Sequence, residues 1–334
     1  MNPNRPSKPP RILGLISNPH SRRNRLALES VKSIVANQSH IHHCITRNAS
    51  DIGPALRSFA SRGVNVLAIN GGDGTTSQVF TELLVQAPFA QLPAIILLPG
   101  GTTNMNVGDV GLRGGLVKAV QRMVDWLNSE ADNTERLVRP ILKVSGGVGC
   151  TPLCGMFFGT GTLISGIEYC KEHVHTRGIR DELGPGLVML RTLWGMARRE
   201  PRFCDPTPTR ITLDQHDNPT DRPVVQLLIS SLQRLFLGLY PFWGKEPGVL
   251  RCTWMEKPTR RLWRAFPALV RGRPNRHLSA DNGYFSHNAD EIRLLMDGIF
   301  TLDGEMHQAR REHGPLVISN GGNLEFLRIP DLLT

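Results

Sequence analysis

Two glycine-rich runs in the first third of the chain combine residue types that bind phosphate groups. They are residues 70–76 (NGGDGTT) and 99–104 (PGGTTN). At a strand end, adjacent glycines leave backbone N–H groups bare, and a following helix N-terminus adds about half a positive charge. The first run is neither a Gly-x-Gly-x-x-Gly fingerprint nor a P-loop, because no Gly-Lys-Ser/Thr follows. A plain tight turn is the alternative for this run taken alone.

Asp73 stands inside the first run, where its charge would repel a bare phosphate. A divalent cation or a nucleotide hydroxyl that partners the carboxylate would remove this conflict. The first run therefore predicts a nucleotide site in which a carboxylate takes part.

The elements predicted around the two runs place them side by side. Strands are expected at 11–17, 41–46, 64–70 and 94–98, and helices at 25–37, 51–62, 75–85 and 115–127. This alternation predicts a mostly parallel sheet with helices on its faces. Both runs then lie at the carboxyl edge of neighbouring strands, which is the usual ligand crevice of such α/β folds.

The second half of the chain has a different character. Short strand-like runs between Gly, Pro, Asn and Asp turns predict a mainly antiparallel β-sandwich. We expect a flexible tail at 1–10, an α/β ATP-binding domain at 11–139, a β-sandwich lipid-acceptor domain at 140–305, and a C-terminal segment at 306–334 that packs back on the first domain.

Composition and charge narrow the class of protein. The 334 residues carry a formal net charge of +10, and 40% of them are hydrophobic, which excludes a chain that is disordered throughout. No stretch of about 18 apolar residues is present, and the N-terminus MNPNRPSKPP lacks the apolar core of a signal peptide. These features predict a soluble, cytoplasmic protein.

Residues 251–276 hold eight basic residues against Glu256 alone and follow the aromatic run 235–243 (LFLGLYPFW). Together they predict peripheral docking on an anionic membrane. A core strand and a solvated helix are the alternative for the two stretches. Nucleic acid is excluded as a partner, because no RNA-binding signature or zinc finger accompanies the basic residues.

The ordered motifs Asn18-Pro19, Thr46, 71–75, 101–104 and 302–305 (LDGE) resemble the diacylglycerol kinase catalytic domain family. That family includes bacterial lipid kinases, sphingosine kinases and ceramide kinases. The resemblance implies ATP and Mg²⁺ in a cleft between an α/β domain and a β-sandwich, with a lipid hydroxyl as the acceptor.

The resemblance also implies roles for individual residues. Asp303 is expected to be the general base, although in sphingosine kinases the aspartate that matches Asp73 has the catalytic role. A hairpin turn is the alternative for Asp303-Gly304, and a hairpin is expected at Asp297-Gly298. The residues implied at the nucleotide are Asn18, Thr46, Gly71, Gly72, Asp73, Gly74, Thr75, Gly101, Thr102, Thr103, Asn104 and Glu305.

Departures from the family pattern keep other functions open. Met105 replaces a common Asp, Gln78 replaces a common Glu, and Pro247-Gly248 replaces an Asp-Gly of an accessory magnesium site, so no metal ligand is assigned. Phosphorylation of a soluble acceptor, as in NAD kinases, and a degenerate member that binds without turnover are the alternatives. The sequence leaves open which lipid is used and whether the chain forms a homodimer.

Overall fold

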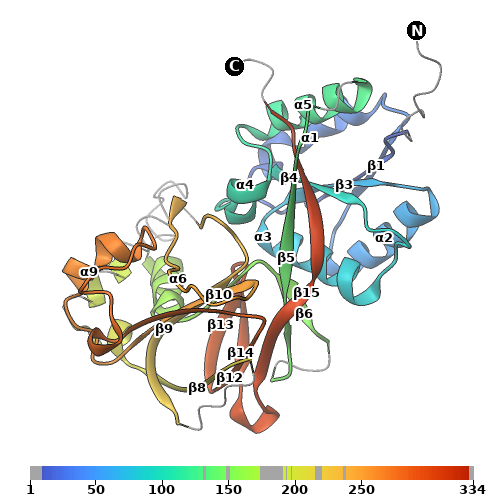
Figure 1. Cartoon of the computed structure of the whole chain (residues 1–334). Helices are drawn as coiled ribbons and strands as arrows, with labels where there is room; N and C mark the ends of the chain where they lie inside the picture. Colours follow the sequence, from blue (N-terminus) through green and yellow to red (C-terminus); the bar gives the residue numbers. More distant parts are fainter. Residues whose placement is uncertain are drawn as a thin grey trace, which may run out of the picture.

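Helices cover both faces of a parallel sheet in the first part of the chain (Figure 1). The structure is a computed structural model, which describes residues 10–130, 133–147, 151–173, 191–192, 194–196, 198–214, 220–235 and 238–330. The strands of this sheet are β1 (Leu13–Ser17), β2 (Ile41–Ile45), β3 (Val66–Gly71) and β4 (Ala94–Pro99). Their order is β4-β3-β1-β2, and each neighbouring pair is parallel.

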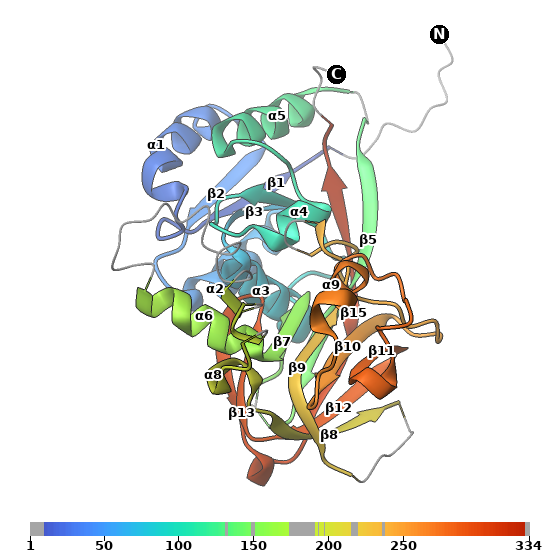
Figure 2. The same cartoon turned by 90° about the vertical axis from the view of Figure 1, so that its left-hand side faces the viewer.

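The side chains of β1 alternate between two cores, which explains the layers. Leu13 and Leu15 pack with helices α1 (Asn24–Val35) and α5 (Leu116–Asn128). Ile16 packs with helices α2 (Ile52–Ser61) and α3 (Asp73–Thr81) on the other face. Figures 1 and 2 show α1 and α5 together on one side of the sheet, with α2 and α3 on the other. The helices of this part are α1 (Asn24–Val35), α2 (Ile52–Ser61), α3 (Asp73–Thr81), α4 (Met105–Val110) and α5 (Leu116–Asn128).

The second part of the chain is built mainly of antiparallel strands around a separate core. Its strands are β5 (Glu135–Ser145), β6 (Leu153–Gly155), β7 (Phe157–Gly161), β8 (Thr207–Leu213), β9 (Arg222–Ser230), β10 (Leu250–Glu256), β11 (Tyr284–Ala289), β12 (Glu291–Met296), β13 (Gly298–Leu302), β14 (Glu305–Ala309) and β15 (Leu316–Arg328). Its helices are α6 (Thr162–His173), α8 (Pro201–Cys204) and α9 (Leu262–Leu269). The predicted fold class, a parallel α/β part followed by an antiparallel part, is confirmed. No helix in the described ranges is long and apolar enough to cross a membrane.

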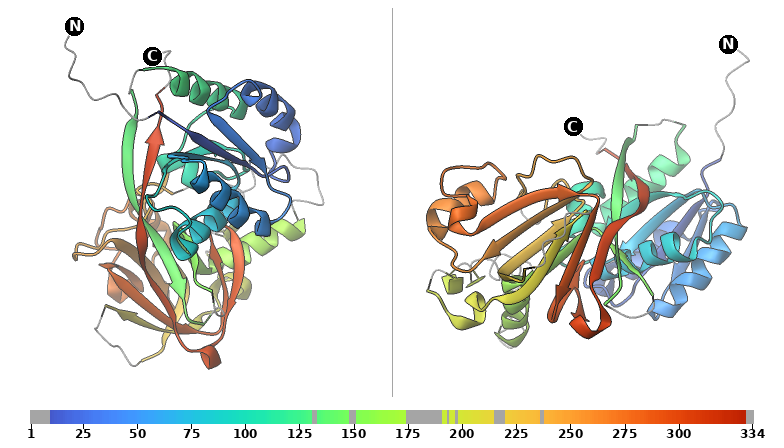
Figure 3. Two further views of the ribbon diagram at one scale, coloured as in Figure 1. Left: turned by 90° about the vertical axis from the view of Figure 1, so that its right-hand side faces the viewer. Right: turned by 60° about the horizontal axis from the view of Figure 1, so that its bottom comes forward.

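A long antiparallel ribbon of β5 and β15 joins the two parts (Figure 3). It pairs from Glu135 with Arg328 to Val317 with Ser145. At its far end Phe326 of β15 pairs in parallel with Ile95 of β4, so the last strand lies beside the first sheet. The expected boundary at 139 falls inside β5, and the domain limits stay a prediction. Of the expected tail, residues 1–9 lie outside the described part.

The structure differs from the sequence prediction at Asp297-Gly298, which is not a hairpin turn. β12 pairs with β8 and β15, whereas β13 pairs with β7 and β14, so the two strands around this turn are not partners. Gly298 has a φ of 153°, a backbone conformation open to glycine, and the chain changes neighbours there. An Asp-Gly pair between two alternating apolar runs is compatible with a hairpin and also with a turn after which the chain joins other strands. The sequence pattern is the same in both cases.

The aromatic run 235–243 is not an exposed wedge where the structure describes it. Leu235 is 9% exposed and Phe242 is 2% exposed, and both pack in the core shared with α2 and α3. The run is also not a strand in its described residues, and Phe236 and Leu237 lie outside them. A membrane contact in this region therefore needs other apolar side chains.

Candidate functional site

The first glycine-rich loop connects β3 to α3 without a side-chain cap. Gly72 is the N-cap of α3 in an extended conformation, and Asp73 begins the helix. A Cβ atom at Gly71 would lie 2.6 Å from the Cβ of Thr75, so only glycine fits there. The Asn18 side chain donates to the Thr75 hydroxyl at 2.8 Å and ties the end of β1 to this loop. Backbone N–H groups at the start of α3 are thus free of a capping side chain.

The second loop is closed by Asn104, which adopts a left-handed conformation with φ of 49°. Its side-chain oxygen accepts from the Gly101 N–H at 2.8 Å, and its amide donates to the Gly101 carbonyl at 2.9 Å. Thr102 and Thr103 are exposed at the tip. Because β3 and β4 are neighbours, the loops meet: a Cβ at Gly101 would lie 2.7 Å from the Cα of Gly72.

Asp73 points its carboxylate at the N-terminus of α4. Its oxygens accept the backbone N–H groups of Met105 at 3.1 Å and Asn106 at 3.2 Å. These donations and the helix dipole favour the charged form, whereas burial favours the neutral form and raises the pKa of Asp73 overall. Asp73 is half-buried, so part of the residue remains accessible to solvent.

Asp303 lies in a two-residue turn between β13 and β14, in which Leu302 pairs with Glu305. Asp303 has a φ of 48° and Gly304 a φ of 90°, as this type of hairpin turn requires. The alternative prediction, a hairpin turn at Asp303-Gly304, is therefore correct for the backbone. The side chain is nevertheless turned inward and is only 2% exposed, which a surface turn would not need.

Three N–H groups hold the Asp303 carboxylate. The backbone N–H groups of Met156 and Phe157 donate at 3.0 Å and 2.9 Å, and the Asn106 side chain donates at 3.3 Å. Burial, followed by the negative charge of Asp73, raises the pKa of Asp303 to about 8 in spite of these donations. The two aspartates are therefore coupled electrostatically.

Glu305 covers the first loop from the second part of the molecule. A Cβ atom at Gly74 would collide with the Glu305 carboxylate, so this carboxylate lies against the first turn of α3. The contact between the two parts of the molecule continues along α3. The Ser77 hydroxyl donates to the Cys154 carbonyl at 2.6 Å, and the Cys154 N–H donates to Thr81 Oγ1 at 2.9 Å. These bonds fix β6, and with it the Asp303 pocket, against α3.

The structure brings most of the predicted residues together. Asn18, 71–75, 101–104, Asp303 and Glu305 are linked by the contacts above. Thr46 lies further away, directly after the edge strand β2; it is buried and its N–H donates to the Ser17 carbonyl at 3.0 Å. It is therefore at the same edge of the sheet but separated from the loops by β1.

Sequence reasoning missed Asn106, Asn24 and Gly155. Asn106 is fully buried in α4 and contacts both aspartates. Asn24, at 1% exposure, donates to the carbonyls of Asn18 and Asn70 and so fixes the ends of β1 and β3. A Cβ at Gly155 would lie 2.8 Å from Asp303 Oδ2. Only the polar Asn106 directly after the second loop offered a sequence signal.

A cavity of about 280 Å³ opens beside the second loop. Two exposed arginines, Arg113 and Arg234, face it from opposite parts of the chain, and neither guanidinium forms an ion pair within the described residues. The lining residues are Thr103, Asn104, Met105, Gly108, Arg113, Arg234, Leu235 and Gly238.

Comparisons with known proteins relate the first part of the chain to one family. Residues 13–135 match the model of the diacylglycerol kinase catalytic domain. This match confirms the resemblance for the motifs within residues 13–135, whereas the motif 302–305 lies outside it. A curated relative, the probable lipid kinase YegS-like of Enterobacter sp. (strain 638), is 32% identical over 107 residues, which are 32% of this chain and 36% of that protein. The match therefore spans about a third of that relative.

Solved structures share the fold over nearly the whole chain. A putative diacylglycerol kinase from Bacillus anthracis str. Sterne superposes with a TM-score of 0.62 at 18% identity and covers 96% of this chain and 97% of that one. A second structure, of a diacylglycerol kinase from the same organism, gives a TM-score of 0.58 at 17% identity with the same coverage. At this identity the similarity concerns the fold.

Proposed function

We propose that this protein is an ATP-dependent lipid kinase, which transfers the γ-phosphate of ATP to a lipid hydroxyl at a membrane surface. One observation carries the proposal: Asp73 and Asp303, from opposite parts of the chain, meet at Asn106 beside two glycine-rich loops in backbone contact. Phosphoryl transfer needs positioned phosphates, neutralised charge and a carboxylate near the accepting hydroxyl. The site holds groups for each of these tasks.

The residues present fit a nucleotide. A Cβ at Gly72 would meet nothing closer than the Gly101 Cα at 3.8 Å, so its face is open, and the start of α3 has no side-chain cap. Phosphate groups bind readily where a glycine and a helix N-terminus are open together. Thr75 and Asn18 are hydrogen-bonded at the start of α3, and Thr102 and Thr103 are exposed on the neighbouring loop.

The donor set also fits Mg²⁺ in its usual nucleotide-bound form. Mg²⁺ is commonly held by one or two carboxylates together with substrate phosphates. Asp73 and Glu305 both border Gly74 and are the carboxylates suited to this task, and within the described ranges no group of three or more His, Cys, Asp or Glu residues forms a closed metal site. Bound with the nucleotide, the ion would neutralise charge that develops on the phosphates.

The two aspartates supply the acid–base chemistry. The resemblance assigns the general base to Asp303, whose raised pKa of about 8 suits proton acceptance near neutral pH. Asp73 is the more exposed of the two, and its charge contributes to the raised pKa of Asp303. We propose that the Asp303 carboxylate takes up the hydroxyl proton of the acceptor during phosphoryl transfer, while Asp73 stays charged beside it.

The cavity beside Asn104 is the proposed entry for the acceptor head group. Met105, whose N–H donates to Asp73, lines this cavity, and the cations Arg113 and Arg234 in its lining suit a polar or anionic head. Replacement Arg234→Ala is therefore expected to raise the KM for the lipid while leaving the KM for ATP unchanged. An equal rise of both constants would place this cavity on the nucleotide side.

Transfer of radiolabelled phosphate from ATP to a panel of diacylglycerol, sphingoid base, ceramide and phosphatidylglycerol, with thin-layer separation, tests the function. We expect one labelled lipid, and a loss of about 10²-fold or more in turnover for Asp303→Asn with nucleotide binding retained. The exposed Asp125→Asn is the matched control. Label found only in NAD would favour a soluble acceptor, and ATP binding without any labelled product would favour a non-catalytic member.

A further inference from the structure

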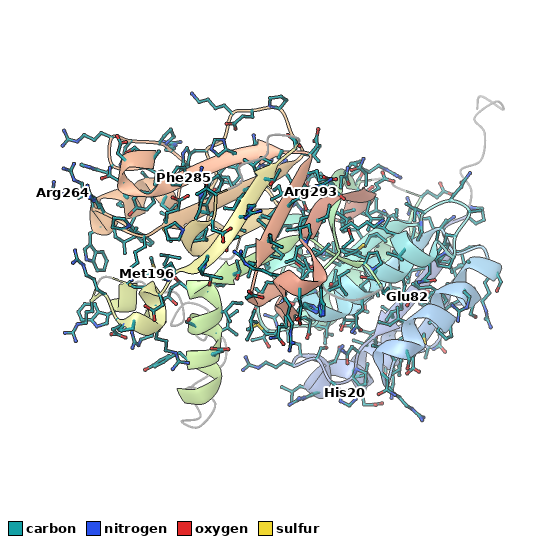
Figure 4. The ribbon with its side chains drawn as sticks, turned by 90° about the horizontal axis from the view of Figure 1, so that it is seen from below. His20, Glu82, Met196, Arg264, Phe285 and Arg293 are labelled. Carbon is teal, nitrogen blue, oxygen red and sulfur yellow. The ribbon has the colours of Figure 1, made fainter. Side chains whose placement is uncertain are left out.

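Helix α9 exposes its largest apolar side chain to solvent. Ala265 and Ala268 are buried in a small core with Met196 and Phe203, whereas Trp263 is 59% exposed. Figure 4 shows Arg264 of the same helix at the outer edge of the molecule, pointing away from it. The packing of α9 therefore does not require the indole of Trp263.

Seven exposed cationic side chains lie on α9 and on the segments next to it. None of their charged groups forms an ion pair with a carboxylate in the part of the chain that the structure describes. They are the exposed Lys257, Arg260, Arg261, Arg264, Arg271, Arg273 and Arg276. Three of these guanidinium groups act on the buried His277, since burial and then Arg276, Arg261 and Arg264 lower its pKa. Arg276 also donates from Nε to His277 Nε2 at 3.3 Å.

A second exposed tryptophan lies on a neighbouring segment. Trp194 is 52% exposed, and the Arg198 guanidinium lies 4.8 Å from the centre of its ring. Met196 of this segment packs in the same small core as Ala265 of α9. Two tryptophans with adjacent arginines thus flank one core, a composition typical of surfaces that lie at a membrane interface.

We propose that α9, with the basic residues of 257–276 and the segment of Trp194, docks on a leaflet rich in anionic phospholipid. The inference rests on the proposed function, because a lipid kinase must reach an acceptor in a bilayer. Trp263 and Trp194 would lie at the level of the head groups, and the guanidinium groups would bind lipid phosphates. The surface replaces the aromatic run 235–243, of which Leu235 and Phe242 are buried.

The segment 239–242 links this surface to the catalytic side. The Tyr240 N–H donates to the Val270 carbonyl at 2.9 Å just after α9, and Leu235 of the same connection lines the cavity beside Asn104. The proposed docking surface and the cavity beside Asn104 are thus joined through this part of the chain.

Sedimentation of the full chain with vesicles tests the proposal without nucleotide or turnover. At low salt we expect binding to phosphatidylcholine vesicles that contain about 30–40% phosphatidylglycerol. We expect little binding to vesicles of pure phosphatidylcholine. Each basic residue at an anionic surface contributes about a fivefold factor, so the triple reversal Arg260→Glu, Arg261→Glu, Arg264→Glu should weaken partitioning by roughly 100-fold or more. Trp263→Ala should weaken it by about 10-fold at any salt concentration.

The matched control reverses three exposed charges on the first part of the molecule, Arg57→Glu, Arg62→Glu and Lys118→Glu. An equal loss of binding in this control, or none in the α9 triple variant, overturns the proposed surface. Binding to duplex RNA but not to vesicles would overturn it as well. A protein that binds anionic vesicles but phosphorylates no lipid contradicts the proposed function alone, whereas one that phosphorylates lipid in detergent but ignores vesicles contradicts the docking surface alone.

Discussion

The carboxylates of Asp73 and Asp303 are held by one residue, Asn106, through its backbone N–H at 3.2 Å and its side-chain amide at 3.3 Å. Asn106 is the second residue of α4, a helix that directly follows the second glycine-rich loop. A shift of this helix therefore moves both carboxylates relative to the loops. The arrangement gives the loop that would bind phosphate a direct connection to the two aspartates of the proposed acid–base chemistry.

The pH dependence of turnover tests the coupling of the two aspartates. If Asp303 accepts the proton, kcat/KM should rise with pH and level off above about pH 8, because the buried carboxyl has a pKa of about 8. This rise is the acidic limb of the pH profile. Asp73→Asn removes the negative charge that helps to raise this pKa, so the limb of the residual activity should move to lower pH. A limb that vanishes in Asp73→Asn but stays in Asp303→Asn would identify Asp73 as the base.

Stability should depend on the same proton. The pKa of Asp303 is about 8 in the folded chain and 3.8 in the reference state, so between these values the folded protein holds a proton that the unfolded chain has lost. Its contribution to the free energy of unfolding is complete below about pH 4 and is lost as pH rises to about 8. Urea unfolding between about pH 5 and pH 8 measures this effect. The free energy of unfolding should fall less with rising pH in Asp303→Asn than in the wild type. Parallel curves for the two proteins would contradict the raised pKa.

Gly155 should set the position of the Asp303 carboxylate. A methyl group there would lie 2.8 Å from Asp303 Oδ2 and from Leu302 Cγ, so Gly155→Ala must displace the acid. We expect turnover to fall by about 10-fold or more with unchanged ATP binding, and stability to fall by about 1–3 kcal/mol. Gly115→Ala, with open space around its Cβ, is the control. Wild-type turnover and an unmoved pH limb in Gly155→Ala would show that the carboxylate tolerates displacement.

Gly72→Val should block the nucleotide without unfolding the protein. The φ of Gly72 is −89°, which any residue adopts, and its Cβ direction is open, so the added side chain occupies only the space left for phosphate. Calorimetric titration with ATP should show a loss of affinity of about 10-fold or more, and the unfolding temperature should stay close to that of Gly115→Val. Unchanged affinity in the folded variant would place the phosphates elsewhere.

The sequence could predict the parts of the site that local rules govern. The strand–glycine–helix pattern at 70–76 located the first loop because glycine and a helix N-terminus act within a few residues. Parallel strand order then placed the second loop beside it, as the pairing of Gly71 with Pro99 shows. Both inferences needed only neighbouring residues and the general geometry of α/β sheets.

Long-range packing accounts for what the sequence did not reveal. The inward turn of Asp303 depends on the N–H groups of Met156 and Phe157, which β6 and β7 supply from far away in the chain. Similarly, Leu235 and Phe242 look like an exposed wedge in sequence, yet they fill a core built by the first part of the molecule. Helix α4 was not expected because its six residues are too few for a periodic pattern.

A buried ion pair should hold α4, and therefore Asn106, in place. Asp109 of α4 accepts from Arg139 Nε of β5 at 3.1 Å, with side chains only 5% and 10% exposed, and also accepts the Gln233 N–H at 3.2 Å. Arg139→Met leaves the Asp109 charge buried without its cation, which should lower the free energy of unfolding by about 3–5 kcal/mol. Adding Asp109→Asn keeps an acceptor for Gln233 but removes the charge, so the double variant should recover part of this loss.

An exposed ion pair between the same two strands, β5 and β15, supplies the control for this comparison of single and double variants. Glu325 bonds Arg136 at 2.9 Å with side chains 37% and 53% exposed, so Glu325→Ala should cost less than about 1 kcal/mol. Urea unfolding of the single and double variants measures the coupling, and turnover at saturating ATP reports on the position of Asn106. A double variant as unstable as Arg139→Met would contradict the role of the buried charge, because the loss would then come from packing of the arginine alone.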